Sequence, residues 1–218
     1  MKTLLASKQL DEYTEQHTSA ELPVLAKLNR ETNLKRGDAV MLSGHLQGSF
    51  LQMMSKMIRP KIVLEIGTFT GYSAICLAMG LQDGGHVHTI EIDEELHDMA
   101  AQYIEEAGLQ DKITQHTGSA IDIIAELEGP FDMVFIDADK SNYERYFDLV
   151  FDKVPVGGYI MADNVLYDGE VILPEEQQTK NARAIGSFNR KIKADDRIEH
   201  LLVPIRDGVM IARKLRDK

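Results

Sequence analysis

The chain has 218 residues, 44% of them hydrophobic and 27% charged, which are the proportions of an ordinary globular protein able to bury one core. Its formal net charge of -11 argues against a broad nucleic-acid surface. A local basic patch is the alternative interpretation for five residues, and a solvated helix face is the favoured one. The five residues are Lys180, Arg183, Arg190, Lys191 and Lys193. Apolar runs are too short to cross a bilayer, and residues 1–7 lack a signal-peptide core, so a cytoplasmic location is expected.

The predicted elements alternate between strands and helices. Residues 1–35 are expected to form an N-terminal helical extension, with Leu22, Leu25 and Leu28 on one side. Apolar, β-rich segments predict strands at 62–66, 86–91, 113–116, 131–136 and 158–162. Helices are expected over 72–79, which places the single cysteine Cys76 in the core, and over 96–107, with Gly108 as the C-terminal cap. This alternation predicts an α/β fold with a parallel sheet covered on both faces.

The last part of the chain breaks that alternation. Residues 201–205 and 209–212 are apolar, and only Arg206, Asp207 and Gly208 separate them. Such a connection suits an antiparallel hairpin and is too short for a parallel crossover. We therefore expect a doubly wound, mostly parallel sheet that ends in an antiparallel hairpin.

A glycine turn follows the first predicted strand. Residues 65–73 read EIGTFTGYS, which does not match the glycine spacing of the dinucleotide fingerprint. S-adenosylmethionine has no phosphate, and its ammonium and carboxylate suit an acid at Glu65, open backbone at Gly67 and the hydroxyl of Ser73. Glu91 ends the second strand, where a carboxylate can accept both ribose hydroxyls. The alternative interpretation is a structural turn with a solvated carboxylate.

Two further strand ends carry oxygen ligands. Asp137 follows the fourth strand, and Asp163 and Asn164 follow the fifth, so the three should meet at one sheet edge. Carboxylate and amide oxygens suit a hard cation, first Mg²⁺, with Mn²⁺ or Ca²⁺ as other choices. A helix cap or a turn is the alternative for each site. Lys140 should lie beside this cation in a dry pocket that disfavours its charged form, which predicts a general base; a solvent-facing helix lysine is the alternative.

At these motifs the chain resembles the cation-dependent O-methyltransferases, the group that holds catechol O-methyltransferase and the plant caffeoyl-CoA O-methyltransferases. The matching segments are LEIGTFTGYSA from Leu64, FIDADKSNY from Phe135 and ADNVL from Ala162, within a resemblance from about Val40 to the C-terminus. The resemblance implies a Rossmann-like class I methyltransferase fold with seven strands, in a single domain over residues 1–218. It also implies a homodimer.

The resemblance also implies roles for individual residues. Asp137, Asp163 and Asn164 would bind the metal, and Lys140 would be the catalytic base. Two adjacent acceptor oxygens would chelate the cation, and the deprotonated oxygen would displace the methyl group from sulfonium in line. Cofactor contacts are implied for Met41, Ser43, Glu65, Gly67, Thr68, Ser73, Glu91, Ile92, Ala120 and Asp137, with Met41 and Ile92 flanking the methionine and adenine parts.

The expected function is methyl transfer from S-adenosylmethionine to a hydroxyl of a small catechol-like or hydroxycinnamoyl acceptor, with no membrane partner. Ala138 stands where the animal catechol enzyme has tryptophan, and the chain has no tryptophan, so the DADK segment matches the plant and bacterial branch better. The first alternative is methylation of a hydroxylated uridine in tRNA, which the net charge disfavours. A protein that binds S-adenosylmethionine without catalysis is the second, and a NAD-dependent dehydrogenase is weaker still.

Overall fold

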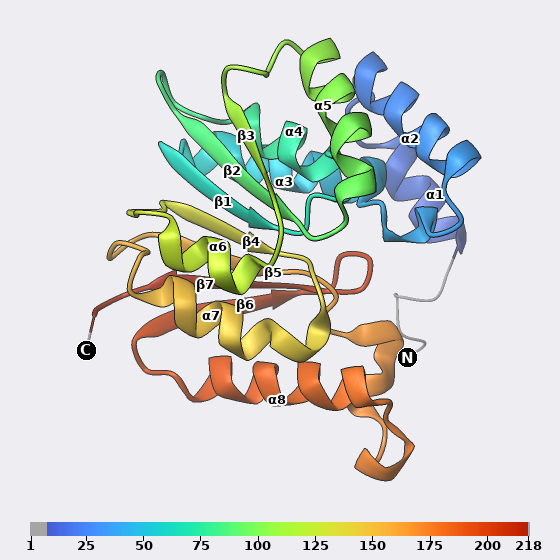
Figure 1. The fold of residues 1–218 in the computed structure, drawn as a ribbon. Helices are drawn as coiled ribbons and strands as arrows, with labels where there is room; N and C mark the ends of the chain where they lie inside the picture. Colours follow the sequence, from blue (N-terminus) through green and yellow to red (C-terminus); the bar gives the residue numbers. More distant parts are fainter. Residues whose placement is uncertain (1–7, 218) are drawn as a thin grey trace. The chain divides into compact units, whose positions relative to one another are not determined.

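The computed structural model describes residues 8–217, which divide into two compact units (Figure 1). One unit comprises residues 8–61 and 68–119, and the other comprises 62–67 and 120–217. Residues 1–7 of the predicted N-terminal extension lie outside the described residues. The single domain over 1–218 stays a prediction.

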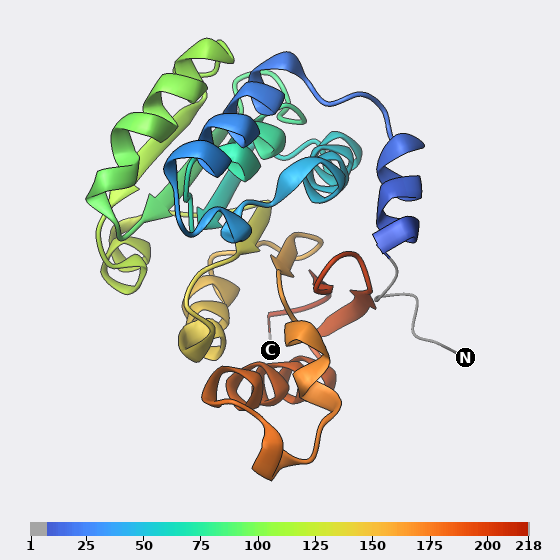
Figure 2. The same cartoon turned by 90° about the vertical axis from the view of Figure 1, so that its right-hand side faces the viewer.

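The first unit packs helices against a pair of parallel strands, β2 and β3, in which Val87 pairs with Ile113. Helix α2 lies beside α5 (Figures 1 and 2) and also contacts α3 and α4. The elements are α1 (Lys8–Gln16), α2 (Pro23–Lys35), η2 (Ala39–Met41), α3 (Gly44–Ile58), α4 (Tyr72–Ala78), β2 (His86–Glu91), η3 (Glu94–Leu96), α5 (His97–Glu106) and β3 (Ile113–Thr117).

Several predictions for this unit are confirmed and one is wrong. Helix α5 ends as expected, because Gly108 has a φ of +69° and Leu109 N–H donates to the Ile104 carbonyl at 3.0 Å, a Schellman cap. Leu22 was expected within a helical segment, on one side with Leu25 and Leu28. It precedes the first residue of α2, Pro23, and is 37% exposed, whereas Leu25 and Leu28 are buried.

The second unit contains five strands in the order β1-β4-β5-β7-β6. The pairs β1–β4 and β4–β5 are parallel, and β5–β7 and β6–β7 are antiparallel, which confirms the terminal hairpin. The elements are β1 (Ile62–Ile66), α6 (Ala120–Glu126), β4 (Met133–Ile136), η4 (Lys140–Asn142), α7 (Tyr143–Phe151), β5 (Tyr159–Ala162), η5 (Tyr167–Ile172), η6 (Glu175–Gln177), α8 (Lys180–Ala194), β6 (Ile198–Val203) and β7 (Val209–Lys214).

Strand boundaries differ most at β6, which was expected over 201–205. It begins at Ile198 and ends at Val203, because Pro204 has no N–H to donate to the ladder. Its first residues were missed because Glu199 and His200 are exposed on the last strand of the order and carry little apolar signal. β4 also begins later than expected, at Met133, and β5 begins at Tyr159.

Helices α7 and α8 run alongside one another (Figures 1 and 2), with Phe147 and Phe188 buried between them at a ring-centroid separation of 6.4 Å. The buried ammonium of Lys214 donates to the carbonyls of Phe151 and Val154 at 2.9 and 2.8 Å, which stabilises the C-terminal end of α7. Among the basic residues of 180–193, Lys191 pairs with Asp148 and the other four are exposed, and the solvated helix face stays a prediction. Within residues 8–217, no helix has the length and apolarity needed to span a membrane.

Candidate functional site

The ends of β4 and β5 lie next to each other in the second unit. The parallel register pairs Ile136 with Ala162, and Asp137 and Asp163 each come directly after these residues. The Asp163 N–H donates to the Ile136 carbonyl at 3.0 Å, so the ladder continues to the last residue before the loop. The predicted juxtaposition of these two strand ends is confirmed.

The ammonium group of Lys140 joins the two strand ends. Its Nζ donates to Asp137 Oδ1 at 3.0 Å, to Asn164 Oδ1 at 2.7 Å and to the Tyr143 hydroxyl at 2.7 Å. These three bonds use all the donors that an ammonium has. The Lys140 side chain is only 15% exposed, so the alternative of a solvent-facing helix lysine is wrong.

Tyr143 is the first residue of α7 and is fully buried. Its ring packs edge-on against Phe188, with the centroids 5.5 Å apart. Burial, and then the charges of Asp137 and Asp163, raise the pKa of the Tyr143 hydroxyl well above its usual value. The hydroxyl therefore stays neutral and can accept a hydrogen bond from Lys140 at any working pH.

Asp139, between the candidate ligand and the lysine, stabilises the turn. Its carboxylate accepts hydrogen bonds from the Ser141 hydroxyl at 3.1 Å, from Asn142 Nδ2 at 2.6 Å and from the Tyr146 hydroxyl. The local turn therefore uses Asp139 as its acceptor, and Asp137 is left to contact Lys140.

Gly67 allows the ends of β1 and β4 to approach closely. Its φ is +103°, and a Cβ there would lie 1.9 Å from the carbonyl oxygen of Asp137. Open backbone was expected at this glycine for a ligand, and the structure shows that the approach of Asp137 already requires it. Glu65, on the same strand, is fully buried, and Ala120 is the first residue of α6.

In the first unit, Glu91 ends β2 as predicted, but its carboxylate is not simply solvated. It accepts three backbone hydrogen bonds, from the N–H groups of Phe69 at 2.8 Å, Ile92 at 2.9 Å and Asp93 at 3.0 Å. Two carboxylate oxygens offer about four lone-pair sites, so acceptor capacity remains.

The other cofactor residues predicted in this unit differ in exposure. The hydroxyl groups of Thr68 and Thr89 form a hydrogen bond with an O···O distance of 2.5 Å. Ser73 is buried in the first turn of α4. Ser43, before α3, is also buried. Met41 and Ile92 are 54% and 76% exposed, an unusual position for large apolar side chains.

The three candidate metal ligands in the second unit, Asp137, Asp163 and Asn164, are two carboxylates and one amide, all hard oxygen donors. Asp137 Oδ1 and Asn164 Oδ1 both point at the same positive charge, that of Lys140. This donor chemistry fits Mg²⁺, Mn²⁺ or Ca²⁺. No group of three or more His, Cys, Asp or Glu side chains suited to a metal occurs in residues 8–217, so the described chain offers no zinc-type cluster.

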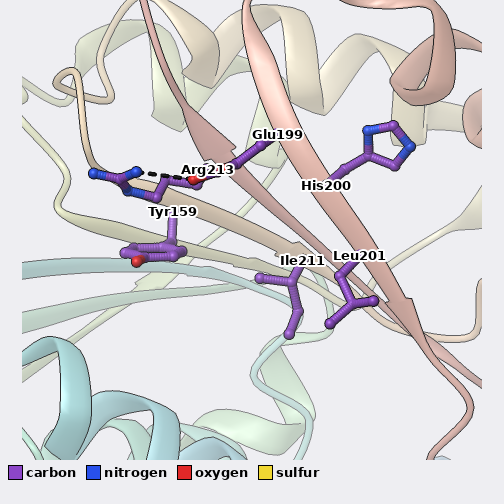
Figure 3. Close-up of a pocket in the computed structure, with 6 residues that line it drawn as sticks. All are labelled: Tyr159, Glu199, His200, Leu201, Ile211 and Arg213. Atoms are coloured by element: carbon purple, nitrogen blue, oxygen red, sulfur yellow. Dashed lines mark hydrogen bonds and ion pairs between the residues drawn. The ribbon is translucent and has the colours of Figure 1, made fainter.

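A shallow pocket of about 240 Å³ lies elsewhere in the second unit, on the β5–β7–β6 sheet face (Figure 3). Arg213 and Glu199 form an ion pair at 2.8 Å across its strands, next to Tyr159. Both charged side chains are well exposed, and such pairs contribute little stability. None of the predicted site residues lines this pocket, so it is separate from the candidate site.

Sequence reasoning missed one residue of the site, Tyr143, and the contact of Asp207 with the loop that follows Asn164. Tyr143 lies three residues after Lys140, a spacing that places both on one face of a helical turn, and this signal could have found it. Asp207 was interpreted only as a turn residue, yet its side chain accepts a hydrogen bond from the Asp168 N–H at 2.6 Å. Only the fold brings residues 168 and 207 together.

Known proteins are similar to this chain over most of its length. The O-methyltransferase family model matches residues 15–215. The chain is 35% identical to a caffeoyl-CoA O-methyltransferase of Eucalyptus gunnii over 226 residues, which covers 99% of this chain and 91% of that protein. It is 33% identical to caffeoyl-CoA O-methyltransferase 1 of Arabidopsis thaliana over 226 residues, which covers 98% and 87%.

Solved structures show the same fold. The SAH-bound methyltransferase PaMTH1 of Podospora anserina matches with a TM-score of 0.89 at 26% identity, covering 99% of this chain and all of that one. An O-methyltransferase of Bacillus cereus in complex with SAH matches with a TM-score of 0.83 at 32% identity, covering 94% and 97%. The chain therefore belongs to the class I S-adenosylmethionine-dependent O-methyltransferase family, as its motifs predicted.

Proposed function

We propose that this O-methyltransferase acts on small acceptors with two adjacent hydroxyl groups, of the catechol or hydroxycinnamoyl kind, and needs a divalent cation. The observation that carries the proposal is the convergence of Asp137 Oδ1 and Asn164 Oδ1 on the single positive charge of Lys140. Two oxygen donors that already bind the positively charged ammonium of Lys140 have the charge and the donor chemistry for a metal ion. Asp163, which the β4–β5 register places beside Asp137, would be the third ligand.

Each residue then has a defined part in the reaction. Asp137, Asp163 and Asn164 would hold the cation, which would lower the pKa of the acceptor hydroxyls when bound. As a neutral amine, Lys140 Nζ would take the proton of the attacking hydroxyl and become the ammonium, while the Tyr143 hydroxyl holds Nζ in place. The acceptor oxygen forms a bond to the methyl carbon as the carbon–sulfur bond breaks, and catalysis depends mainly on aligning these atoms.

The cofactor roles stay those implied by the motifs. Backbone groups and buried hydroxyl groups suit the zwitterionic amino-acid end of S-adenosylmethionine. The exposed apolar residues Met41 and Ile92 suit the methionine and adenine parts of this cofactor. The proposed contacts are Met41, Ser43, Glu65, Gly67, Thr68, Ser73, Glu91, Ile92, Ala120 and Asp137. A homodimer, a cytoplasmic location and a single domain are proposed from the family resemblance and composition alone.

The segment that follows Asn164 favours acceptors without a polyanionic group. Residues 165–179 contain four acids, Asp168, Glu170, Glu175 and Glu176, and no lysine or arginine. Phosphates of coenzyme A or tRNA would be repelled by this charge, which adds to the net charge of -11. We therefore place free catechols before coenzyme A esters, and hydroxylated uridine in tRNA last.

The test measures methyl transfer from labelled S-adenosylmethionine to caffeic acid, caffeoyl-CoA and hydroxyuridine-containing tRNA, each with Mg²⁺ and with EDTA. We expect metal-dependent product with caffeic acid and less with caffeoyl-CoA. Asp163→Ala should abolish the metal-dependent product, whereas Asp196→Ala, which changes an 82%-exposed aspartate of an ion pair, should not. Equal product in EDTA would refute the cation requirement, and product with tRNA alone would favour the nucleic-acid alternative.

A further inference from the structure

The loop that carries Asn164 leaves the sheet in an uncommon conformation. The Asp163 N–H still belongs to the ladder, because it donates to the Ile136 carbonyl at 3.0 Å. The next residue, Asn164, has a positive φ of 55°. This conformation is uncommon outside glycine, and it persists only where surrounding contacts enforce it. The position of Asn164 therefore depends on how the residues after it are held.

The two residues that follow, Val165 and Leu166, are held by hydrogen bonds from two elements. Their N–H groups donate to backbone carbonyls of the β6–β7 turn at 3.1 and 2.9 Å. The carbonyl of Val165 accepts a hydrogen bond from Asn189 Nδ2, in α8, at 2.7 Å. The first two bonds join backbone groups, so the third is the one that depends on the identity of a side chain.

The amide of Asn189 has one defined orientation. A carbonyl only accepts hydrogen bonds, so the end of the amide that faces Val165 is the nitrogen. The other end, Oδ1, is buried and has no hydrogen-bond partner among the residues that the structure describes. A buried acceptor without a partner lowers stability. The interaction that accounts for an amide at this position is therefore its bond to the Val165 carbonyl.

The preceding residue of α8 supports another part of the site. Phe188 packs edge-on against Tyr143, with the ring centroids 5.5 Å apart, and the Tyr143 hydroxyl accepts from Lys140 Nζ at 2.7 Å. Lys140 Nζ also donates to Asn164 Oδ1 at 2.7 Å. Two consecutive residues of α8 are thus each linked through one residue to a proposed functional group, Phe188 to the base and Asn189 to the cation ligand.

We propose that Asn189 is a positioning residue for Asn164, the proposed cation ligand, which it holds through the Val165 carbonyl. The inference rests on the proposed cation site. Without the Nδ2 donor, the Val165–Leu166 peptide group loses one of its two hydrogen bonds. The positive φ of Asn164 then loses part of the contact that enforces it. Asn164 Oδ1 is free to turn away from the cation position, and the affinity for the cation falls.

The experiment titrates Mn²⁺ into the protein without cofactor or acceptor and counts free Mn²⁺ by electron paramagnetic resonance. Asn189→Leu removes the donor from a side chain of similar size. Mn²⁺ binding should weaken about tenfold, the lower end of the usual effect of removing an outer partner of a metal site. Asn181→Leu, the same change on the same helix, removes an exposed bond to the Tyr167 hydroxyl and should bind as the wild type does. Wild-type binding by Asn189→Leu would overturn the inference.

A double-mutant cycle with Asn164→Ala gives a readout that a general loss of structure would not produce. If residue 189 acts through residue 164, the loss caused by Asn189→Leu should shrink to about twofold or less in the Asn164→Ala protein, since both changes affect one ligand. An equal loss in both backgrounds would show that Asn189 does not act through Asn164. Asn189→Ala, which also removes the donor, replaces Asn189→Leu if that variant does not fold, with the same expected and contradicting results.

The wild-type titration separates this inference from the proposed function. No Mn²⁺ binding by the wild type would refute the cation site and, with it, the role of Asn189. Tight binding by both the wild type and Asn189→Leu would leave the cation site standing and remove only Asn189 from its role.

Discussion

The acids at two strand ends, Glu91 after β2 and Asp137 after β4, have the same position in sequence terms but different partners. Glu91 accepts three backbone N–H groups from its own loop and the glycine turn. Asp137 accepts from the side chain of Lys140, whose other bonds go to Tyr143 and Asn164. Backbone donors are fixed by the fold, whereas a lysine side chain can rotate away.

That difference indicates what each acid can do. Glu91 first stabilises the backbone at Phe69, Ile92 and Asp93, and can bind a ligand only with its remaining lone pairs. Asp137 accepts from a side chain that can rotate away, so the same oxygen would be available to the proposed cation. The two strand-end acids therefore differ in whether their hydrogen-bond donors can move. The substitutions below test that difference.

The largest effect is expected for Lys140→Ala. Removing the proposed base should lower kcat by about 10²- to 10⁴-fold while S-adenosylmethionine binding persists. Steady-state kinetics and calorimetric cofactor titration measure the two separately. Lys191→Ala, which removes a surface lysine paired with Asp148, is the control. Undiminished turnover in Lys140→Ala would remove this residue from the mechanism.

Gly67→Ala should reduce folding stability by about 2–4 kcal/mol, because a new methyl group would meet the Asp137 carbonyl oxygen at a positive φ. For a chain of this size that corresponds to roughly 5–15 °C in Tm. Gly37→Ala, where the new Cβ meets nothing within 4 Å, should keep the wild-type Tm in the same calorimetric scan. Equal Tm values for the two variants would contradict the close approach.

Glu91→Gln should cost about 1–2 kcal/mol of stability, because the amide cannot accept at both ends and leaves an N–H group unsatisfied. The dissociation constant of S-adenosylmethionine should also rise, since the proposed ribose acceptor is weakened. Chemical denaturation and calorimetry measure these effects, with Glu199→Gln at an exposed ion pair as control. A change in cofactor binding with wild-type stability would show that the loop bonds contribute little.

The smallest effect is a pH dependence from the first unit. Burial, and then the charges of His86 and His116, lower the pKa of His88 to about 4, below its value of about 6.5 in an unfolded chain. The unfolded state then binds more protons, so stability is complete above about pH 6.5 and falls as the pH drops toward 4. Tm should decrease by a few degrees between pH 7.5 and 5, and less in His88→Gln. His200→Gln, at an exposed histidine, should retain the wild-type slope.

Most of the fold could be predicted because its signals are local. Strands such as Ile62–Ile66 are continuous apolar runs, and Gly108 marks a helix end by its conformational freedom alone. The exceptions depend on tertiary contacts. The first residues of β6 look polar because one face of the strand is exposed, and Leu22 has the right spacing but precedes the helix.

The candidate site was predictable to the same degree. Asp137, Lys140, Asp163 and Asn164 follow strand ends, so the topology alone brings them together. Asp207 is some 40 residues away in sequence from Asn164, and no periodicity connects a hairpin turn to a loop. Glu91 was found for its position, but its three backbone donors could be seen only once the loop around it had a conformation.

The buried position of Cys76 has a practical consequence. It is the only cysteine of the chain, and it lies under Gly48, where even an added methyl group would come within 2.9 Å of its sulfur. Thiol reagents should therefore leave the native protein almost unlabelled. A cysteine introduced within residues 165–179, for example at the exposed Ile172, would then be the only thiol that reacts. A fluorophore or spin probe attached there could report acceptor binding without background labelling of Cys76.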